Sequence, residues 1–393
     1  MQIQKFKDLT KEAFTEIKKY QVGKKGIIKT GLPYFDDVFP VVNGSVIVFS
    51  AGSGIGKSYT LAKMVENILN EDLNPLSKNF AVLNISLEMR VLSLVLRGMA
   101  KNIKSKTKKE ILLQEFTDEE KLQAKAYFES LQDDRVSISQ VPTTPAKFYE
   151  GCKEFLELNK DKDSVVITVD HLALISADSG EARNAIIEKF IERVNDLKME
   201  YENVIFILLS QTNSEMIKRA KDKDIMSQPQ PSDLYYSQFT FQVADFVAVM
   251  TNPTKIGIKE YSKIDPERYP NLEKFFLEED TKGRVSLEPF GVNYVHLLKC
   301  READGLYLDI YAEELHIPDV ENLRKKRRSE VGASKIVHEI PMFVGTKPDF
   351  PKPEVEKPVE PNFDVSSAFD PPVIKPEEPM FANSQDDDED APF

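Results

Sequence analysis

The stretch Val46-Ile-Val-Phe-Ser50, continued by Ala51-Gly-Ser-Gly-Ile-Gly-Lys-Ser58, decides the fold of this chain. The apolar run predicts a buried strand and the pattern of residues 58–70 predicts a helix, so a glycine-rich loop joins a strand to a helix. In that setting consecutive backbone N–H groups and the helix N-terminus form a cradle for phosphate. We therefore predict a P-loop for ATP, with Lys57 at the β and γ phosphates and the Ser58 hydroxyl as a ligand of Mg²⁺.

The predicted nucleotide-binding residues run without a break through the loop and into the helix. They are Ala51, Gly52, Ser53, Gly54, Ile55, Gly56, Lys57, Ser58 and Tyr59. Ala51 stands where the strict motif has its first glycine, which is tolerated if its backbone keeps a negative φ.

Further apolar runs alternate with amphipathic segments along the chain. Strands are predicted at residues 45–50, 81–85, 164–169, 204–209, 246–250 and 294–298, and helices at 58–70, 90–102 and 185–200. Buried strands that alternate with helices indicate an α/β fold with a central, mostly parallel sheet flanked by helices.

Polar side chains close three of these strands. Asp170 ends the run 165–170 and fits a residue that holds Mg²⁺ through water; the alternative is a solvent-capped strand end. Glu88 follows the run 81–85, and on a strand beside the P-loop strand it would polarise the attacking water as a general base, unless it only caps the next helix. Gln211 ends a third run and would sense the γ-phosphate.

Composition limits the remaining possibilities. The formal charge is -13 and the pI about 5.1, so any DNA contact has to come from local basic loops rather than from bulk charge. The two cysteines have no metal or disulfide spacing. Neither a signal-type apolar segment nor a run of eighteen apolar residues occurs, and we expect a soluble, cytoplasmic protein, located in the host cytoplasm if the source is viral.

The chain divides into three parts. Residues 1–27 form a linker with a charged helix at 10–20, capped by Thr10; residues 28–322 form the ATPase domain, with an insertion at about 251–289; residues 323–393 hold a basic run and then an acidic, Pro-rich tail from Pro341. That tail is too poor in branched aliphatics to fold alone, so we expect disorder. Its tip, 386–393, is similar to the acidic Pro-Phe end of bacterial single-stranded DNA-binding proteins and would dock on a partner, unless it only adds solubility.

Taken together, the motifs resemble the RecA-like motor domain of the DnaB-type hexameric replicative helicases. Order and spacing agree from about Ile28 to Asn322. The markers are Thr30-Gly31 with Phe35 and Asp36, Ser86-Leu87-Glu88-Met89, Asp170 to Ile175, Ser210-Gln211 with Asn213, Ser232-Asp233-Leu234, Gln242 with Ala244 and Asp245, and Lys299-Cys300-Arg301.

The resemblance implies a homo-oligomer, usually a ring of six, with ATP between subunits and Glu88 as the base. Arg301, with Lys299, would reach the γ-phosphate of the neighbouring subunit as an arginine finger. From the residues alone, this pair at a strand end favours a solvated basic edge. A compact chain of this kind would suit a bacteriophage replication protein.

In this family two loops grip single-stranded DNA inside the ring. Here they are residues 177–184, with Arg183, and residues 216–231; a plain solvated loop is the alternative for the second, because Asp222 and Asp224 dilute its charge. The cations of the second loop are Lys218, Arg219, Lys221 and Lys223.

The sequence also departs from the family pattern. Ser214 and Tyr235-Tyr236 replace charged residues of the family, and the family's helical N-terminal domain is not seen before the motor domain. Primase and a loader are therefore candidate partners only.

We predict an ATP-dependent DNA helicase that translocates on single-stranded DNA and unwinds duplex during replication. Two alternatives remain. One is a RecA/RadA-like recombinase filament, and the other is an ATP-assembled adaptor that recruits partners through its acidic tail.

Overall fold

The computed structural model describes residues 6–103, 105–177, 182–223, 225–226, 228–235, 237–258, 260–261, 263–301, 309–315, 317 and 320–333. The tail from Pro341, with its acidic tip, lies outside these residues. The compact unit of the chain extends to Ala333. Within the described part, no helix has the length and apolar character needed to cross a bilayer.

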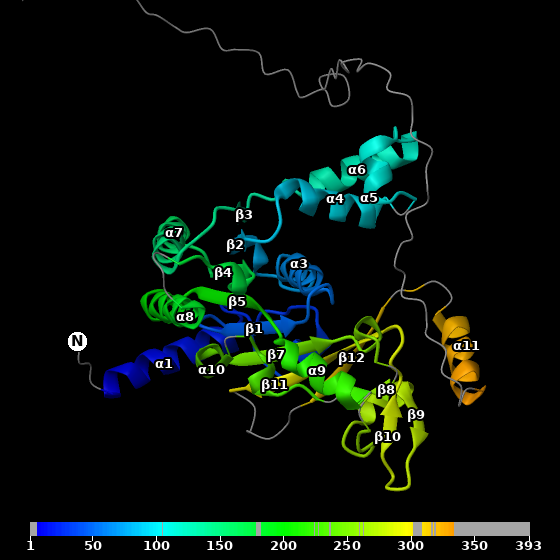
Figure 1. The fold of residues 1–393 in the computed structure, drawn as a ribbon. Coiled ribbons are helices and arrows are strands. Elements are labelled where there is room, and N and C mark those ends of the chain that lie inside the picture. The colour runs from blue at the N-terminus through cyan, green and yellow to red at the C-terminus, as the bar shows by residue number, and fades with distance from the viewer. Residues whose placement is uncertain are drawn as a thin grey trace, which may run out of the picture. The chain divides into compact units, whose positions relative to one another are not determined.

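A single large sheet organises the described chain (Figure 1). Its eight strands lie in the order β12-β11-β7-β1-β5-β4-β2-β3, and all neighbours are parallel except β11, which is antiparallel to both β7 and β12. The strands are β1 (Val46–Ala51), β2 (Phe80–Ser86), β3 (Val136–Ser139), β4 (Ser164–Asp170), β5 (Val204–Gln211), β7 (Phe246–Thr251), β11 (Val292–Cys300) and β12 (Ile310–Glu314). The predicted mostly parallel α/β sheet is thus confirmed.

Helices cover both faces of this sheet. The helices are α1 (Phe6–Gln21), α2 (Pro33–Asp36), α3 (Lys57–Ile68), α4 (Val91–Asn102), α5 (Lys108–Leu113), α6 (Asp118–Ser130), α7 (Pro145–Leu158), α8 (Arg183–Glu200), α9 (Ser214–Lys223), α10 (Ser237–Val243) and α11 (Val320–Ala333). Short 3-10 turns are η1 (Ser77–Asn79), η2 (Leu172–Leu174), η3 (Pro231–Asp233), η4 (Thr254–Ile256) and η5 (Pro270–Phe275).

Successive side chains along a strand point to opposite faces of the sheet, so the core has one part on each face. Val46 and Val48 of β1 join the core beneath α7 and α8, whereas Ile47 and Phe49 join the core on the α3 face. Helix α8 completes the first core because its apolar residues recur at helical spacing, from Ile186 to Leu197. Each β1 side chain is removed from water, which is why this run reads as continuously apolar.

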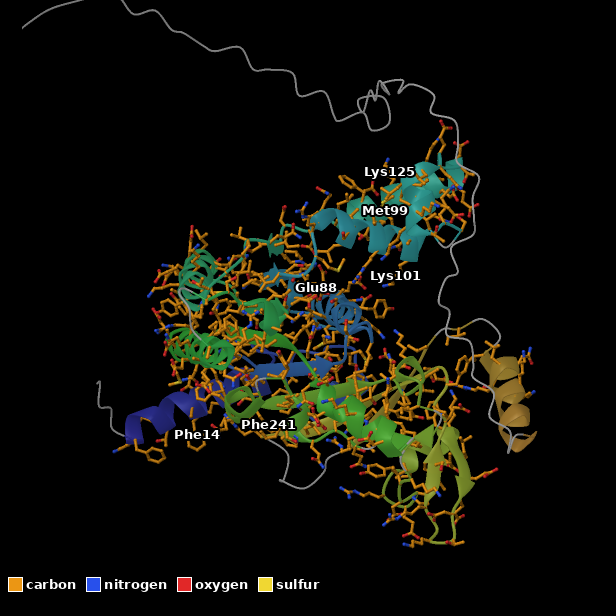
Figure 2. All side chains as sticks on the ribbon, viewed as in Figure 1. Phe14, Glu88, Met99, Lys101, Lys125 and Phe241 are labelled. Carbon is orange, nitrogen blue, oxygen red and sulfur yellow. The ribbon has the colours of Figure 1, made fainter. Side chains whose placement is uncertain are left out.

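Helix α1 begins earlier than the sequence predicts. It starts at Phe6, and Thr10 lies inside it with its hydroxyl donating to the Lys7 carbonyl (2.9 Å), so Thr10 as the N-cap is wrong. The helix presents apolar side chains to solvent, including Phe14, which is 67% exposed and labelled in Figure 2.

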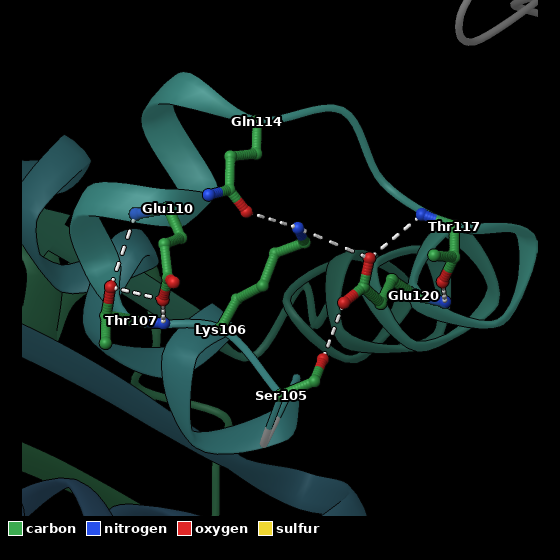
Figure 3. A network of polar contacts seen from close by, with 7 residues as sticks. All are labelled: Ser105, Lys106, Thr107, Glu110, Gln114, Thr117 and Glu120. Atoms are coloured by element: carbon green, nitrogen blue, oxygen red, sulfur yellow. Dashed lines mark hydrogen bonds and ion pairs between the residues drawn. The ribbon is translucent and has the colours of Figure 1, made fainter.

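Between β2 and β3 the chain builds a lobe of three helices, α4, α5 and α6 (Figure 3). Thr107 and Thr117 each cap a helix through a reciprocal box with the glutamate three residues later. Lys106 ties the two helices together, because its ammonium donates to Gln114 (2.9 Å) and lies 3.7 Å from Glu120. Only the first of these helices was predicted.

The segment predicted as an insertion has a small core of its own. It contains β8 (Glu260–Tyr261), β9 (Phe276–Glu279) and β10 (Val285–Leu287), and β8 pairs with β6 (Ile225–Met226) just after α9. Met216 and Ala220 of α9 are buried in the same cluster as Tyr261 and Tyr294. The insertion therefore packs against α9, as Figure 1 also shows.

Candidate nucleotide and nucleic-acid site

The carboxyl ends of neighbouring strands bring the predicted catalytic residues to one edge of the sheet. Gln211 lies directly beside Ala51 in the β1–β5 register, and Asp170 lies beside Ser86 in the β2–β4 register. One prediction is wrong: β2 is not beside the P-loop strand, because β5 and β4 lie between them. Glu88 still comes to this edge, two residues beyond β2, and the Leu87 N–H donates to the Asp170 carbonyl (2.8 Å).

The P-loop has the backbone that a phosphate cradle requires. Ala51 ends β1 in extended conformation, as the sequence prediction required, and Gly54 and Gly56 have φ values of 72° and 127°, which favour glycine. Gly56 then caps α3, whose first residue is Lys57. The Lys57 ammonium donates to the carbonyls of Ala51 (2.9 Å) and Gly52 (3.2 Å), and burial lowers its pKa while Asp170 and Glu88 oppose that shift.

Asp170 and Ser58 fit a site for Mg²⁺. Asp170 is 4% exposed, and burial raises its pKa against a hydrogen bond from Ser58. Its Oδ1 is buried and has no hydrogen-bond partner among the described residues. A cation at this position would favour the charged carboxylate and satisfy that oxygen. Within the described chain there is no cluster of three or more His, Cys, Asp or Glu that could hold a metal by itself.

His171 joins two of the predicted catalytic residues. Its Nε2 lies 3.0 Å from Gln211 Nε2 and 3.7 Å from Glu88 Oε2. Burial lowers the pKa of His171, so the neutral ring is favoured and its Nε2 accepts the Gln211 amide proton. The sequence analysis gave His171 no role. Its place directly after the strand-ending Asp170 was the available signal.

Tyr59, the last predicted nucleotide residue, lies on the outer side of α3. It is 55% exposed, and the Lys101 ammonium of α4 lies 5.3 Å from its ring centroid. This contact links the P-loop helix to the lobe of α4 to α6.

Lys299 and Arg301 lie at the opposite edge of the sheet. Because β11 is antiparallel, its end faces the beginning of β7 and β1, and the Arg301 N–H donates to the Asp245 carbonyl (2.8 Å). The Arg301 guanidinium pairs with the Asp245 carboxylate (2.7 Å) and donates to the Gln242 carbonyl (2.9 Å). Lys299 donates to the carbonyls of Phe241 (2.6 Å) and Gln242 (2.9 Å), and burial lowers its pKa. This pair therefore lies at the opposite end of β1 from the P-loop of its own chain.

Of the first predicted DNA loop, the structure describes only the two ends. Arg183 begins α8, and its guanidinium donates to the carbonyls of Ile175 (2.7 Å) and Ala173. It therefore fastens the end of β4 to α8 in this structure.

The second predicted DNA loop, residues 216–231, is wrong over its first half, because residues 214–223 form helix α9. Asn213 starts it by accepting the N–H of Glu215 (3.1 Å), and Met216 and Ala220 bury one face against the insertion. Its cations differ in their surroundings. Arg219 makes two hydrogen bonds to the buried Asp233 (3.0 and 2.6 Å), which ties the Ser-Asp-Leu motif to the helix.

The other cations of α9 are more available. Lys218 is exposed and pairs with Glu215 (2.7 Å), and Lys221 is exposed. Lys223 ends the helix, with its side chain outside the description. The helix thus offers Lys218 and Lys221 on its surface.

A glycine-rich loop after β1, a buried aspartate ending β4 and an open parallel sheet define a P-loop ATPase with the RecA-like fold. Residues 27–283, well over half of the chain, match the family described as the DnaB-like helicase C-terminal domain, and this chain belongs to that family. It is accordingly an ATP-dependent DNA helicase that functions in replication, as the sequence analysis predicted.

Solved structures share this fold at low sequence identity. The ATPase domain of G40P is similar to 81% of this chain over 97% of its own length, with a TM-score of 0.56 and 16% identity. A DnaB-like replicative helicase, described with its interactions with primase, is similar to 81% of this chain over 66% of its own length, with a TM-score of 0.54 and 16% identity. A comparison with curated protein sequences finds no match.

Proposed function

We propose that copies of this chain assemble head to tail, as a ring of about six, and hydrolyse ATP between neighbouring subunits to move along single-stranded DNA. One observation carries the proposal. The P-loop, Asp170 and Glu88 lie at one edge of the sheet, whereas Lys299 and Arg301 lie at the other edge. A site divided in this way is completed only by a second copy.

Residues 51–59 bind the triphosphate in this proposal. Lys57 exchanges its contacts to Ala51 and Gly52 for the β and γ phosphates, and Ser58 and Asp170 hold Mg²⁺, directly and through water. Bound Mg²⁺ would neutralise charge that develops on the phosphates. Burial of Lys57 and Asp170 strengthens these interactions, because charges attract more strongly where water is excluded.

Glu88 serves as the general base. Its side chain is 50% exposed, so water can reach it, and His171 lies 3.7 Å from its Oε2. The neutral His171 ring accepts the Gln211 amide proton at Nε2, which makes His171 a positioning residue for the side chain proposed to sense the γ-phosphate.

Arg301 supplies charge to the neighbour's phosphates, with Lys299 beside it. Both side chains donate to a carbonyl of α10, and Asp245 pairs with Arg301. These contacts fix the orientation of the two side chains before a neighbouring subunit binds. A delocalised cation placed in trans makes hydrolysis depend on assembly.

DNA is held by the side of α9. Lys218 and Lys221 neutralise phosphates without reading sequence, and Lys223 adds to them. Arg219 acts at this surface by fastening α9 to Asp233, whereas Arg183 fastens the end of β4 to α8, where the first predicted DNA loop ends. So few cations in a chain of formal charge -13 give weak binding, whose affinity for single-stranded DNA falls with salt in proportion to the number of phosphates neutralised.

Further partners follow from the family and the tail. One structural neighbour is described with primase, and we propose primase, a loader or other replication proteins as partners of this chain, some through the acidic tip of the tail. The proposed location is the cytoplasm, or the host cytoplasm if the source is viral.

ATPase turnover with and without single-stranded DNA, measured beside strand displacement and particle mass, tests the proposal. We expect DNA-stimulated turnover, duplex separation and a closed oligomer. Filaments without strand displacement would favour the recombinase alternative. ATP-dependent assembly without turnover would favour the adaptor.

A further inference from the structure

We propose that Lys255 is a positioning residue that couples the P-loop to α9 through the insertion. The Lys255 ammonium donates to the carbonyl of Gly54, at the tip of the P-loop, over 2.6 Å. This is a contact between residues 201 positions apart, and the sequence analysis gave Lys255 no role. The inference rests on the proposed function, since α9 is the segment proposed to hold DNA.

Specific hydrogen bonds hold the turn that carries Lys255. Buried Asn252 accepts the Lys255 N–H (3.0 Å) through its Oδ1 and donates to Asn293 of β11 (2.7 Å) through its amide. Gly257 then closes the turn with a φ of 78°, and the Ile258 N–H donates back to the Pro253 carbonyl (2.9 Å). The lysine stem thus leaves a turn that Asn252 fixes to β11 and that its own backbone hydrogen bonds close.

The acceptor of Lys255 belongs to a peptide unit that faces the phosphate site. The Gly54 carbonyl shares its peptide group with the Ile55 N–H, which makes only a long contact of 3.5 Å to the Gly52 carbonyl. When that N–H donates to a phosphate oxygen, the carbonyl at the other end becomes a stronger acceptor, because hydrogen bonds in a chain polarise one another. Nucleotide binding therefore tightens the contact to Lys255.

Packed side chains connect the turn that carries Lys255 to α9. Ile258 lies three residues after Lys255 and is buried with Tyr261 in the core of the insertion. The same core contains Met216 and Ala220 of α9. The parallel pairing of β6 with β8 joins the chain beyond α9 to the insertion a second time. A shift of the turn at Lys255 is thus transmitted to the helix that carries Lys218 and Lys221.

The test compares Lys255→Met with Lys255→Arg and with a matched control, Lys282→Met. Lys282 is an exposed lysine of the same insertion, in the turn between β9 and β10. Methionine keeps the length of the stem but cannot donate, and arginine keeps the donor. We expect Lys255→Met to lose DNA stimulation of turnover, with basal turnover reduced no more than about fivefold, the usual limit for an exposed ionic contact. Lys255→Arg should recover most of the stimulation and Lys282→Met all of it.

Hydrogen exchange gives a second readout that does not depend on DNA or turnover. With a non-hydrolysable ATP analogue and Mg²⁺, the wild type should gain protection in the P-loop and in residues 214–223, whereas Lys255→Met should gain it in the P-loop alone. Equal responses of α9 in both proteins, or loss of nucleotide binding in Lys255→Met, would overturn the coupling role. If the wild type shows no DNA stimulation, the proposed function fails, and the exchange of α9 still decides the role of Lys255.

Discussion

The division of the site predicts that two inactive variants restore each other. Arg301→Ala keeps an intact P-loop but offers no finger, and Lys57→Ala keeps the finger but lacks the cradle cation. Each alone should hydrolyse ATP poorly. Mixed in one oligomer, they create interfaces at which an Arg301→Ala subunit binds ATP and a Lys57→Ala subunit supplies Arg301.

The structure gives the size of the effect to expect. Arg301 lies at the same edge of the sheet as the beginning of β1, and the P-loop follows the end of β1. The six-residue strand therefore separates Arg301 from the P-loop by about 17 Å at ~3.3 Å per residue. At that distance two unit charges interact by about 1 kcal/mol even with an effective dielectric constant of about 20, which is about fivefold in rate before salt screening. A finger in trans is worth about 10³ to 10⁵. A loss above about a hundredfold in Arg301→Ala therefore comes from the neighbour's site.

Loss of the fold is a poor explanation for such a result. The Arg301 side chain is 48% exposed, and exposed ion pairs contribute about 0–1 kcal/mol. Asp245 would keep two partners, the Val46 N–H (2.9 Å) and the Lys198 ammonium (2.8 Å). The buried carboxylate is thus not left unpaired.

The assay is steady-state turnover of co-expressed, equimolar variants whose mixing is verified by mass. In a head-to-tail assembly about a quarter of the interfaces would have both halves intact, and turnover should rise to about that fraction of the wild-type rate if interfaces act independently. Verified mixed oligomers without recovery, together with wild-type turnover in Arg301→Ala alone, would refute the divided site.

Three other predictions follow from single features. Glu88→Gln should bind ATP normally and hydrolyse it about 10² to 10⁴ times more slowly, since the amide accepts no proton; full activity in a rapid-quench assay would place the base elsewhere. Replacing Lys218 and Lys221 together by Ala should reduce the slope of log affinity for single-stranded DNA against log salt by about 1.4, and an unchanged slope would remove α9 from the DNA path. Burial lowers the pKa of His296 to about 3, so below about pH 6.5 the unfolded chain binds a proton that the folded chain does not. The free energy of unfolding should therefore fall by about 1.4 kcal/mol per pH unit as pH drops below 6. Denaturant titrations of His296→Gln should lack this contribution.

Local signals predicted the elements that hold the phosphate. The run from Val46 to Ser50 is buried throughout, and its glycine-rich continuation has only one plausible use after a strand and before a helix. The strand ends could also be predicted, because Asp170 and Gln211 each stand at the end of a mostly apolar run.

What could not be predicted depends on contacts between distant segments. Strand order is one case, since nothing in the run 81–85 says that β4 and β5 separate it from β1. Helix α9 is another. Its apolar face is only a few residues wide, and the core that buries Met216 and Ala220 is supplied by an insertion with weak periodicity of its own. His171 was missed because a single histidine beside a metal ligand has no spacing to identify it.

The geometry also shows where a ring and a filament of this helicase would differ. Because the cradle and the finger lie on opposite edges of one sheet, any interface that completes the site joins two different surfaces, head to tail. Such an interface closes into a ring when the rotation between neighbours divides a full turn and grows into a filament when it does not. The chemistry at Lys57, Glu88 and Arg301 is the same in both cases, so turnover alone cannot separate them. The distribution of particle masses can, since a closed ring does not grow beyond its own mass as protein concentration rises, whereas a filament lengthens.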